Sequence, residues 1–553
     1  MLAGASRYWY FPRLQLSTDR ALGWPSDEQR KLLMIRYSSK PDPSQQALAQ
    51  DQASDCCRGL VSADESSGTN SESRLENVPL VVDLDGTLLR TDLMFESAVR
   101  LLKQKPWLAA LLPLWLLQGR AYLKRRIFQL TRIDVSLLPV HEDVLAWLKD
   151  EKARGRRLIL ATASDYEQAC SVVQPLRLFD IVLGSDGKRN LKGRHKLKTI
   201  VEACGEKFDY AGNSRADLAI WRGCRHAVIV NAPSRLEHTA RRIGNVVRVF
   251  PRSLTALREA VHAMRGYQWV KNLLLFVPAI TSHTIFDLSV SGKAALAFIS
   301  FGFCASAAYI LNDLLDLEDD RRHATNKDRP FAAGRMSIGS GILLAVACLV
   351  AGAVIAGFLS RGFVTALITY LLLTSLYSFY LKRLLVLDVL TLALLYTLRV
   401  VAGSLATGIV LSPWLLSFAF FLFLSLAFAK RAADLVQHLR ANRSAVPGRG
   451  YITTDLDAVC IAGMCSGFLS ALVLALYINS DSVQLLYRRP ALLWGLQPIL
   501  LYYLTRLWVI CRRGELTGDP IEYTAREPST YGAAFLAVLV LLAATFDFVM
   551  FKP

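Results

Sequence analysis

Asn-Asp-Leu-Leu-Asp-Leu-Glu-Asp-Asp-Arg-Arg-His-Ala-Thr-Asn-Lys-Asp-Arg-Pro-Phe-Ala-Ala-Gly, residues 312–334, is the stretch around which the chain is organised. It follows an apolar segment, 294–311, that approaches the length of a bilayer span. Asp313, Asp316 and Asp320 recur at i, i+3 and i+7, so a continuing helix would place all three on one side, where carboxylates can share a divalent metal. The alternative is a polar loop beside a membrane, but the helical spacing favours the metal site.

Apolar residues make up 53% of the 553 residues and gather in long runs in the C-terminal half. Runs of near-spanning length predict an all-α membrane bundle of about nine transmembrane helices. The runs are 271–286, 292–314, 339–358, 362–381, 385–407, 412–429, 454–477, 491–511 and 531–550. This pattern excludes a wholly soluble protein.

The formal net charge of +18 comes largely from short loops between the apolar runs. Basic residues are concentrated in alternate loops, which predicts a multi-pass protein of a bacterial inner (plasma) membrane, with the acidic stretch and the N-terminal domain facing the cytosol. Anionic, phosphate-bearing substrates and membrane orientation explain this placement better than nucleic acid does. The oligomeric state is left open.

The N-terminal half is predicted to contain three parts. Residues 1–75 are polar and rich in Ser, Asp, Gln and Arg, which predicts a disordered extension. Strand-like runs alternate with helical stretches over 78–232, which predicts a parallel α/β sheet domain. An Arg-rich, amphipathic connector, 233–265, then leads to the membrane domain, 266–553.

Candidate site residues follow the predicted strands of this α/β domain. Asp83 and Asp85 come directly after the run Pro79–Val82, and Thr162 follows the run Arg156–Ala161. Polar side chains also follow further along the chain, namely Lys192, Lys196, Asn213 and Asp217. Because ligands bind at the carboxyl ends of parallel strands, we expect one site there.

These pieces resemble, in this order, the haloacid dehalogenase-like phosphohydrolase superfamily. The resemblance implies that Asp83 is the phosphate-accepting nucleophile, that Asp85 is the general acid and base, and that Thr162 holds phosphoryl oxygens. It implies Lys196 as the stabilising cation, with Lys192 as the alternative. The implied Mg²⁺ ligands are Asp83, Asp85, Asn213 and Asp217, and Asn213 stands where such families usually carry aspartate. A carboxylate can accept a phosphoryl group when a metal and a lysine neutralise its oxygens.

The acidic stretch, with its following Arg329-Pro330 and its place after the second apolar run, resembles the UbiA superfamily of intramembrane prenyltransferases over about 265–550. The resemblance implies that Asp313, Asp316 and Asp320 bind Mg²⁺ and a diphosphate donor. In aromatic prenyltransferases of this superfamily a second Asp-rich motif follows the sixth span. Here Phe428-Ala-Lys-Arg-Ala-Ala-Asp434 occupies that place.

A Lys-Arg pair at this position is suited to gripping phosphate directly. It resembles the branch of the superfamily that transfers phosphoribose to a polyprenyl phosphate. The resemblance implies a set of residues that bind the sugar phosphate or the lipid phosphate: Lys271, Asn272, Asn312, Lys327, Arg329, Lys430, Arg431 and Asp434. Arg399, within an apolar run, needs a partner, which is either an anionic substrate or Asp388.

We therefore expect a bifunctional, Mg²⁺-dependent enzyme. It would transfer 5-phosphoribose from phosphoribosyl diphosphate to a polyprenyl phosphate, for assembly of the cell envelope, and its N-terminal phosphatase would remove the 5-phosphate. One alternative is a prenyltransferase that attaches a polyprenyl chain from its diphosphate to an aromatic acceptor. In that alternative the N-terminal domain is regulatory or degenerate.

Overall fold

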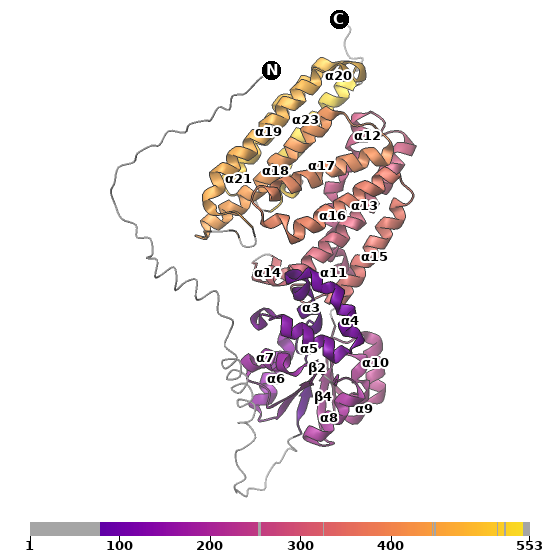
Figure 1. Ribbon diagram of the computed structural model, residues 1–553, viewed down its shortest axis with the longest axis vertical. Coiled ribbons are helices and arrows are strands. Elements are labelled where there is room, and N and C mark those ends of the chain that lie inside the picture. Colours follow the sequence, from indigo (N-terminus) through magenta and orange to yellow (C-terminus); the bar gives the residue numbers. More distant parts are fainter. Residues whose placement is uncertain are drawn as a thin grey trace, which may run out of the picture. The chain divides into compact units, whose positions relative to one another are not determined.

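The fold is described from a computed structural model over residues 78–545, except residues 188, 253–255, 324–325, 445, 447–448, 517 and 525–526. The predicted disordered extension, 1–75, lies outside these residues. The described chain begins with an α/β domain and continues as a helical domain, coloured indigo to magenta and then magenta to yellow in Figure 1.

The α/β domain is built on one parallel sheet of six strands in the order β3-β2-β1-β4-β5-β6. The strands are β1 (Leu80–Val82), β2 (Leu158–Asp165), β3 (Ile181–Ser185), β4 (Asp209–Gly212), β5 (Ala227–Val230) and β6 (Val246–Phe250). This is the strand order of a doubly wound fold. The predicted parallel sheet is confirmed.

Helices cover both faces of the sheet, as Figure 1 shows. Leu80 and Val82 of β1 pack into a core with α6 and α7, whereas Val81 packs into a second core with α8, α9 and α10. The helices of this domain are α3 (Leu93–Gln104), α4 (Leu112–Leu117), α5 (Arg120–Leu130), α6 (Glu142–Ala153), α7 (Tyr166–Val173), α8 (Arg194–Cys204), α9 (Leu218–Gly223) and α10 (Ser234–Ile243). Burial on both faces explains the unbroken apolar runs of the strands.

The sheet extends beyond residue 232, the predicted end of this domain. Strand β6 pairs in parallel with β5 and lies inside the segment predicted as a connector, 233–265. Its arginine and its partly exposed residues conceal the strand pattern, because an edge strand buries less than a central one. The later part of the predicted amphipathic connector forms a helix, α11 (Ala256–Ala263).

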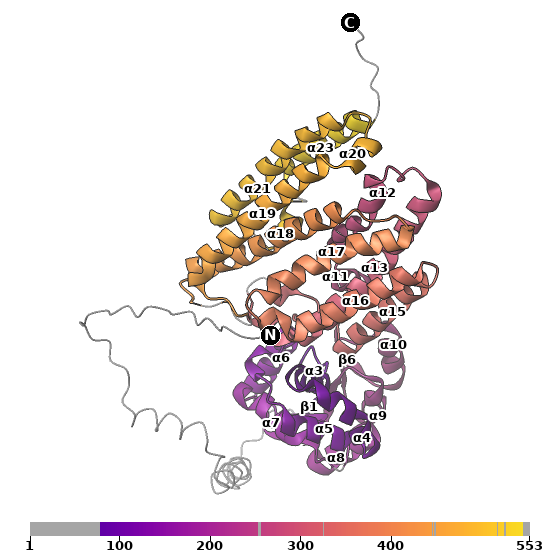
Figure 2. The ribbon, with the colours of Figure 1, turned by 45° about the horizontal axis from the view of Figure 1, so that its top comes forward.

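The helical domain contains long helices that lie side by side in both views (Figures 1 and 2). It comprises the 3₁₀ helix η5 (Gly266–Phe276), then α12 (Val277–Thr281), α13 (Leu288–Leu315), α14 (Leu317–Arg322), α15 (Ile338–Ala356), α16 (Arg361–Phe379), α17 (Leu387–Thr407), α18 (Pro413–Arg440), α19 (Leu456–Ile478), α20 (Asp481–Leu486), α21 (Leu496–Arg512), α22 (Pro520–Thr524) and α23 (Pro528–Thr545).

Seven helical segments in the described chain are long and apolar enough to cross a membrane. They are Leu288–Leu315, Ile338–Ala356, Arg361–Phe379, Leu387–Thr407, Pro413–Arg440, Thr453–Ile478 and Pro528–Thr545. The predicted count of nine is not confirmed. The first predicted run, 271–286, is divided between η5 and α12, and α21 has only 17 residues.

Helices α13 and α15 pack closely because Gly352 has no side chain. A Cβ atom at Gly352 would lie 2.5 Å from Cys304 Sγ and 2.9 Å from the carbonyl oxygen of Ser300. Ser300 Oγ also donates a hydrogen bond of 2.8 Å to the carbonyl of Gly352. The contact therefore fixes how α13, which carries Asp313 near its end, lies along α15.

Candidate active sites

The predicted residues of the α/β domain converge at the carboxyl ends of β1, β2 and β4. Lys196 Nζ, from α8, donates to Asp83 Oδ1 at 2.7 Å and to the hydroxyl oxygen of Tyr210 at 2.7 Å. The Tyr210 hydroxyl donates in turn to Asp217 Oδ1 at 2.8 Å. Lys196 is 3% exposed whereas Lys192 is exposed, so the buried lysine is the partner of Asp83.

Three hydrogen-bond donors hold the carboxylate of Asp85, next to the hydrogen-bonded row of Asp83, Lys196, Tyr210 and Asp217. Ser164 Oγ donates to Asp85 Oδ2 at 2.6 Å, Thr162 Oγ1 donates to the same oxygen at 3.2 Å, and the backbone N–H of Leu93 donates to Asp85 Oδ1 at 2.9 Å. Leu93 is the first residue of α3, so this helix begins at the site. The turn after β1 requires Gly86, whose φ is 77°.

Burial makes both carboxyl groups weaker acids than usual. It raises the pKa of Asp83 to about 6, against the attraction of Lys196. It also raises the pKa of Asp85 to about 6, and the charge of Asp92 adds to that rise. A carboxyl with a pKa near neutrality can both donate and accept a proton under ordinary conditions.

Asn213 lies against the turn at Gly86. A Cβ atom added to Gly86 would meet Asn213 Nδ2 at 2.0 Å, so the amide occupies the space beside the two aspartates. Asp217 is engaged elsewhere, because its Oδ2 accepts hydrogen bonds from the backbone N–H groups of Asn213 and Ser214. Asp217 thus holds the loop that carries Asn213.

In the helical domain, the acidic stretch spans the end of α13 and the start of α14. Arg329 Nη1 lies between Asp313 Oδ1, at 3.3 Å, and Asp320, whose two oxygens are at 2.7 and 2.8 Å. Arg265 also pairs with Asp313. Asp313 and Asp320 are therefore within reach of one shared cationic side chain.

Asp316 does not face the same cation as its two neighbours. Helix α13 ends at Leu315 and α14 begins at Leu317, so Asp316 is the junction between two helices rather than part of one. Its carboxylate accepts hydrogen bonds from Lys103 Nζ at 3.0 Å and from Lys382 Nζ at 2.9 Å. The spacing would place all three acids on one side only of a continuing helix, and here the helix is interrupted at Asp316, whose carboxylate faces the two lysines.

The charges around these acids differ in their effect on ionisation. Burial raises the pKa of Asp320 to about 6, although Arg329 opposes the rise. Burial also disfavours the charge of Asp316, but Lys382 and Lys103 outweigh it and hold the pKa of this carboxyl below its usual range. Asp316 is thus the more firmly ionised acid.

The described residues contain no group of three His, Cys, Asp or Glu side chains arranged to hold a metal ion. The donor chemistry nevertheless fits a hard divalent cation. Asp313 and Asp320 already share the cationic Arg329, and carboxylate oxygens are the ligands that Mg²⁺ prefers. The predicted ligands are present, but they bind basic side chains.

Two predicted phosphate-binding lysines meet at an acid that sequence reasoning missed. Asp519 Oδ2 accepts hydrogen bonds from Lys271 Nζ at 2.7 Å and from Lys430 Nζ at 2.9 Å. Burial disfavours the charge of Asp519, but Lys430 and Lys271 outweigh it and hold the pKa of this carboxyl well below its usual range. The ammonium of Lys271 also lies over the ring of Tyr396, 5.7 Å from its centroid.

Arg431 is separate from this lysine pair. Its Nε lies 2.5 Å from Asp388 Oδ2, its Nη1 lies 2.5 Å from Asp434 Oδ2, and its side chain is 1% exposed. Arg449 also pairs with Asp388 at 3.3 Å. The buried Arg431 therefore joins the half-buried Asp434 to Asp388 in one ion-pair network, whereas the resemblance implied that both Arg431 and Asp434 bind substrate.

Arg399 does not pair with Asp388, which was one of its two expected partners. Its guanidinium donates to Asn272 Oδ1 at 3.2 Å and to the hydroxyl of Tyr370 at 3.0 Å, and lies over the ring of Phe301. Asp388 is instead taken by Arg431 and Arg449. Within the described residues, Arg399 hydrogen-bonds to no carboxylate, so the arginine lies in an aromatic and amide environment.

The remaining predicted residues lie around the acidic stretch. Asn312 is half-buried near the end of α13, and Lys327 is exposed in the 3₁₀ helix η6 (Asn326–Asp328). Asn326 Nδ2 donates to Asp320 Oδ1 at 3.0 Å. Asn326 is therefore a further contact of the acidic stretch.

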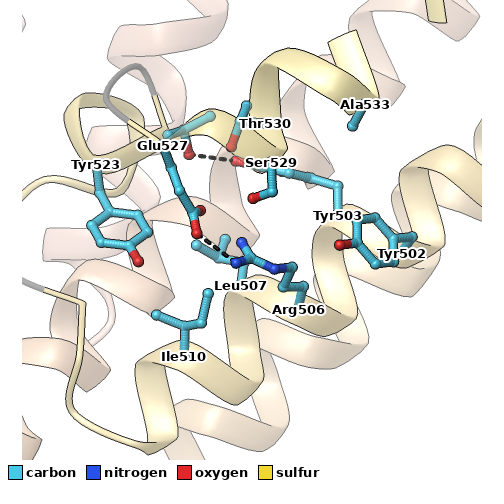
Figure 3. Close-up of a pocket in the computed structure, with 11 residues that line it drawn as sticks. Tyr502, Tyr503, Arg506, Leu507, Ile510, Tyr523, Glu527, Ser529, Thr530 and Ala533 are labelled. Carbon is cyan, nitrogen blue, oxygen red and sulfur yellow. Dashed lines mark hydrogen bonds and ion pairs between the residues drawn. The ribbon is translucent and has the colours of Figure 1, made fainter. Parts of the chain in front are cut away.

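A hollow between α21 and α23 contains none of the predicted site residues (Figure 3). In the close-up, Arg506 points toward Glu527, and the two form an ion pair of 2.6 Å. Tyr503 lies alongside, and its hydroxyl forms a hydrogen bond of 2.9 Å with the hydroxyl of Thr524. The residues that line this hollow therefore do not include the acids of the stretch 312–334.

Comparisons with known proteins identify the helical domain. The UbiA prenyltransferase family matches residues 274–509. "Uncharacterized protein y4nM" of Sinorhizobium fredii is 35% identical over 469 residues, which cover 84% of this chain and 90% of that protein. The match is longer than the helical domain, so it extends into the α/β domain as well.

The chain therefore carries a UbiA prenyltransferase family domain in its C-terminal half. It is thus a transferase, and with its apolar helices it is an integral membrane protein.

Decaprenyl-phosphate phosphoribosyltransferase of Corynebacterium glutamicum is 35% identical over 184 residues, which cover 32% of this chain and 55% of that protein. This chain therefore matches about half the length of that relative. A solved UbiA homologue from Archaeoglobus fulgidus, bound to GPP and Mg²⁺, is 17% identical with a TM-score of 0.39, covering 52% of this chain and 98% of that one.

Proposed function

We propose that the helical domain transfers 5-phosphoribose from phosphoribosyl diphosphate to a polyprenyl phosphate at the cytosolic face of a bacterial inner membrane. The observation that carries the proposal is the pair of charge clusters: acids that share a cation at Asp313 and Asp320, and lysines gathered at Asp519. The 35% identity to a decaprenyl-phosphate phosphoribosyltransferase supports the same donor and acceptor.

The acids of the α13–α14 junction would hold Mg²⁺, with Asp313 and Asp320 as its first ligands and Asp316 beside them. When bound, the metal supplies positive charge to the diphosphate leaving group. Arg329 and Arg265, which the acids bind in this structure, would then be released toward phosphate oxygens. Through the bound metal, the acids would thus position a donor that is itself negatively charged.

The lysines complete the reaction on the acceptor side. Lys271 and Lys430 converge on Asp519 Oδ2, so two ammonium groups lie within reach of one anionic group. A lipid phosphate would bind there, and one of its oxygens would attack the anomeric carbon while the bond to diphosphate breaks. Positioning and charge stabilisation account for such a transfer without a protein nucleophile.

We further propose that the α/β domain is a phosphohydrolase that removes the 5-phosphate from the product. Asp83 would accept the phosphoryl group, and Asp85 would give a proton to the departing sugar oxygen. Lys196, bonded to Asp83 at 2.7 Å, would neutralise phosphoryl oxygens. Water then hydrolyses the acyl phosphate, and inorganic phosphate leaves. Asp83, Asp85 and Asn213 would hold Mg²⁺.

The test uses the full-length protein with polyprenyl phosphate, labelled phosphoribosyl diphosphate and Mg²⁺. Wild type is expected to form a lipid-linked pentose without its 5-phosphate, and Asp83→Ala is expected to accumulate the 5-phosphorylated lipid. Mass spectra of the lipid products distinguish the two. No lipid product from the wild type would overturn the transferase assignment, and identical products from both proteins would overturn the phosphohydrolase assignment.

A further inference from the structure

Helix α3 of the α/β domain packs against the membrane helices. Val99 and Phe95 on α3 share one apolar cluster with residues of α13 and α15, including Ile310 and Ile338. Within this contact, Arg321 Nη2 of α14 pairs with Glu96 Oε1 at 2.6 Å, and both side chains are less than a tenth exposed. Thr91 Oγ1 also donates to Glu96 at 2.7 Å. The buried pair ties α3 to the segment that carries the acids.

The two ends of α3 touch two different sites. At its start, the backbone N–H of Leu93 donates to Asp85. At its last turn, Lys103 Nζ donates to Asp316 Oδ1 at 3.0 Å and to Asp319 Oδ2 at 2.6 Å. The 12 residues of the helix span roughly 18 Å at 1.5 Å per residue.

We propose that Lys103 is a diphosphate-binding residue of the membrane site, supplied by the α/β domain. This inference takes one element from the proposed function, namely that the donor is a diphosphate. Phosphoribosyl transfer and prenyl transfer both use such a donor. The ammonium groups of Lys103 and Lys382 both bind the carboxylate of Asp316, and that of Lys382 lies 2.9 Å from it. When a metal-bound diphosphate meets the acids, the two lysines would exchange carboxylate oxygens for phosphate oxygens.

A purely structural role explains the position of Lys103 less well. Asp316 already has Lys382 as a partner, and the side chain of Lys103 is 24% exposed. The Lys103–Asp316 pair is half-buried, so partial solvent screening reduces what it adds to stability. The contact between α3 and the membrane helices is secured by the buried Glu96–Arg321 pair and by the apolar cluster. A cation beside an acid that is already neutralised is instead available to an incoming anion.

The experiment measures binding of inorganic pyrophosphate, with Mg²⁺, to the full-length protein in detergent by titration calorimetry. Lys103→Ala is expected to weaken binding about tenfold, equivalent to about 1.4 kcal/mol. Lys103→Arg should restore most of the affinity because it keeps the charge. Lys105→Ala is the matched control: Lys105 is exposed just after α3, and its removal should leave affinity unchanged.

A transfer assay then separates positioning from folding. Lys103→Ala should raise KM for the diphosphate donor about tenfold and change kcat less than twofold, with an unchanged unfolding temperature. Equal pyrophosphate affinity in Lys103→Ala and wild type would overturn the inference, as would an equal loss in Lys105→Ala. If wild type transfers no phosphoribose but binds pyrophosphate through Lys103, the proposed function fails and this inference stands.

Discussion

The two acidic sites of this chain are built in opposite ways. In the α/β domain, the predicted groups contact one another: Lys196 binds Asp83, and Thr162 binds Asp85. In the helical domain, Asp320 binds Arg329 of its own stretch. Asp313 also binds Arg265, however, and Asp316 binds bases from elsewhere in the sequence, such as Lys382. A sheet edge fixes its site through the backbone, whereas helix ends depend on which side chains the packing brings to them.

The difference predicts how each site responds to a ligand. At the sheet edge, Asp83 and Asp85 are already oriented by short hydrogen bonds from within the domain. At the α13–α14 junction, ion pairs of Asp313 and Asp320 must be exchanged before a metal can bind. We therefore expect a preorganised site in the first domain and a rearranging site in the second.

Removing one membrane acid should have the largest effect. Asp313→Asn is expected to lower transfer by at least about a thousandfold, roughly 4 kcal/mol, because the metal loses a charged ligand. Phosphatase activity of the same protein should change less than about twofold. The check is a parallel assay of both reactions, with the exposed Asp457→Asn as control. A matching loss of both reactions would show that the sites are not separate.

Breaking the lysine pair should come next. Asp519→Ala leaves the buried Lys271 and the half-buried Lys430 without their shared acid, and removal of one partner from a buried pair typically costs about 3 kcal/mol. The unfolding midpoint in detergent should fall clearly. Asp519→Asn, which keeps the shape and some hydrogen bonding, should lie between this variant and wild type. An unchanged midpoint for Asp519→Ala would mean that the two lysines find other partners.

Restoring an aspartate at the sheet edge should have a moderate effect of the opposite sign. Asn213→Asp adds a carboxylate beside Asp83 and Asp85, so the Mg²⁺ concentration for half-maximal phosphatase activity should fall about tenfold, or about 1.4 kcal/mol. Magnesium titration of wild type and variant measures the shift. Weaker binding in the variant would place the metal away from Asn213.

The smallest effect is expected at the helical domain's exposed ion pair. Arg512 and Asp457 lie 2.7 Å apart, and both side chains are more than half exposed. Solvent and salt screen such a pair, so Arg512→Ala should leave the unfolding midpoint unchanged within error. A clear drop would show that exposure is a poor guide to the strength of ion pairs in this domain.

The α/β site was largely predictable from sequence because it follows strand ends. Asp83, Asp85 and Thr162 each come directly after a buried apolar run, and the parallel sheet brings those ends together. Ser164 and Tyr210 were missed, although both touch the site. Their types carry no distinctive spacing, so only the folded sheet shows that they face the aspartates.

The membrane site was less predictable. Spacing identified Asp313 and Asp320, but it could not show that the helix ends at Asp316. Asp519 is a single acid in a loop far along the chain, and no pattern connects it to Lys271. Asp388 was one of two alternatives for the partner of Arg399, and helix spacing does not determine which of several arginines reaches a buried acid.

The close approach of α13 and α15 has a consequence for how variants of this protein would be interpreted. A side chain at Gly352 would meet Cys304 and Ser300 rather than a proposed phosphate-binding residue, and it would displace α13 along or away from its neighbour. Asp313 is 13 positions further along α13 than Ser300, so it would move with the helix. In a mutational scan, substitutions of Gly352 would lower activity as strongly as substitutions at the reaction centre, although glycine has no reactive group. The loss would come from the displaced helix, so the residues of the reaction centre alone would not explain it.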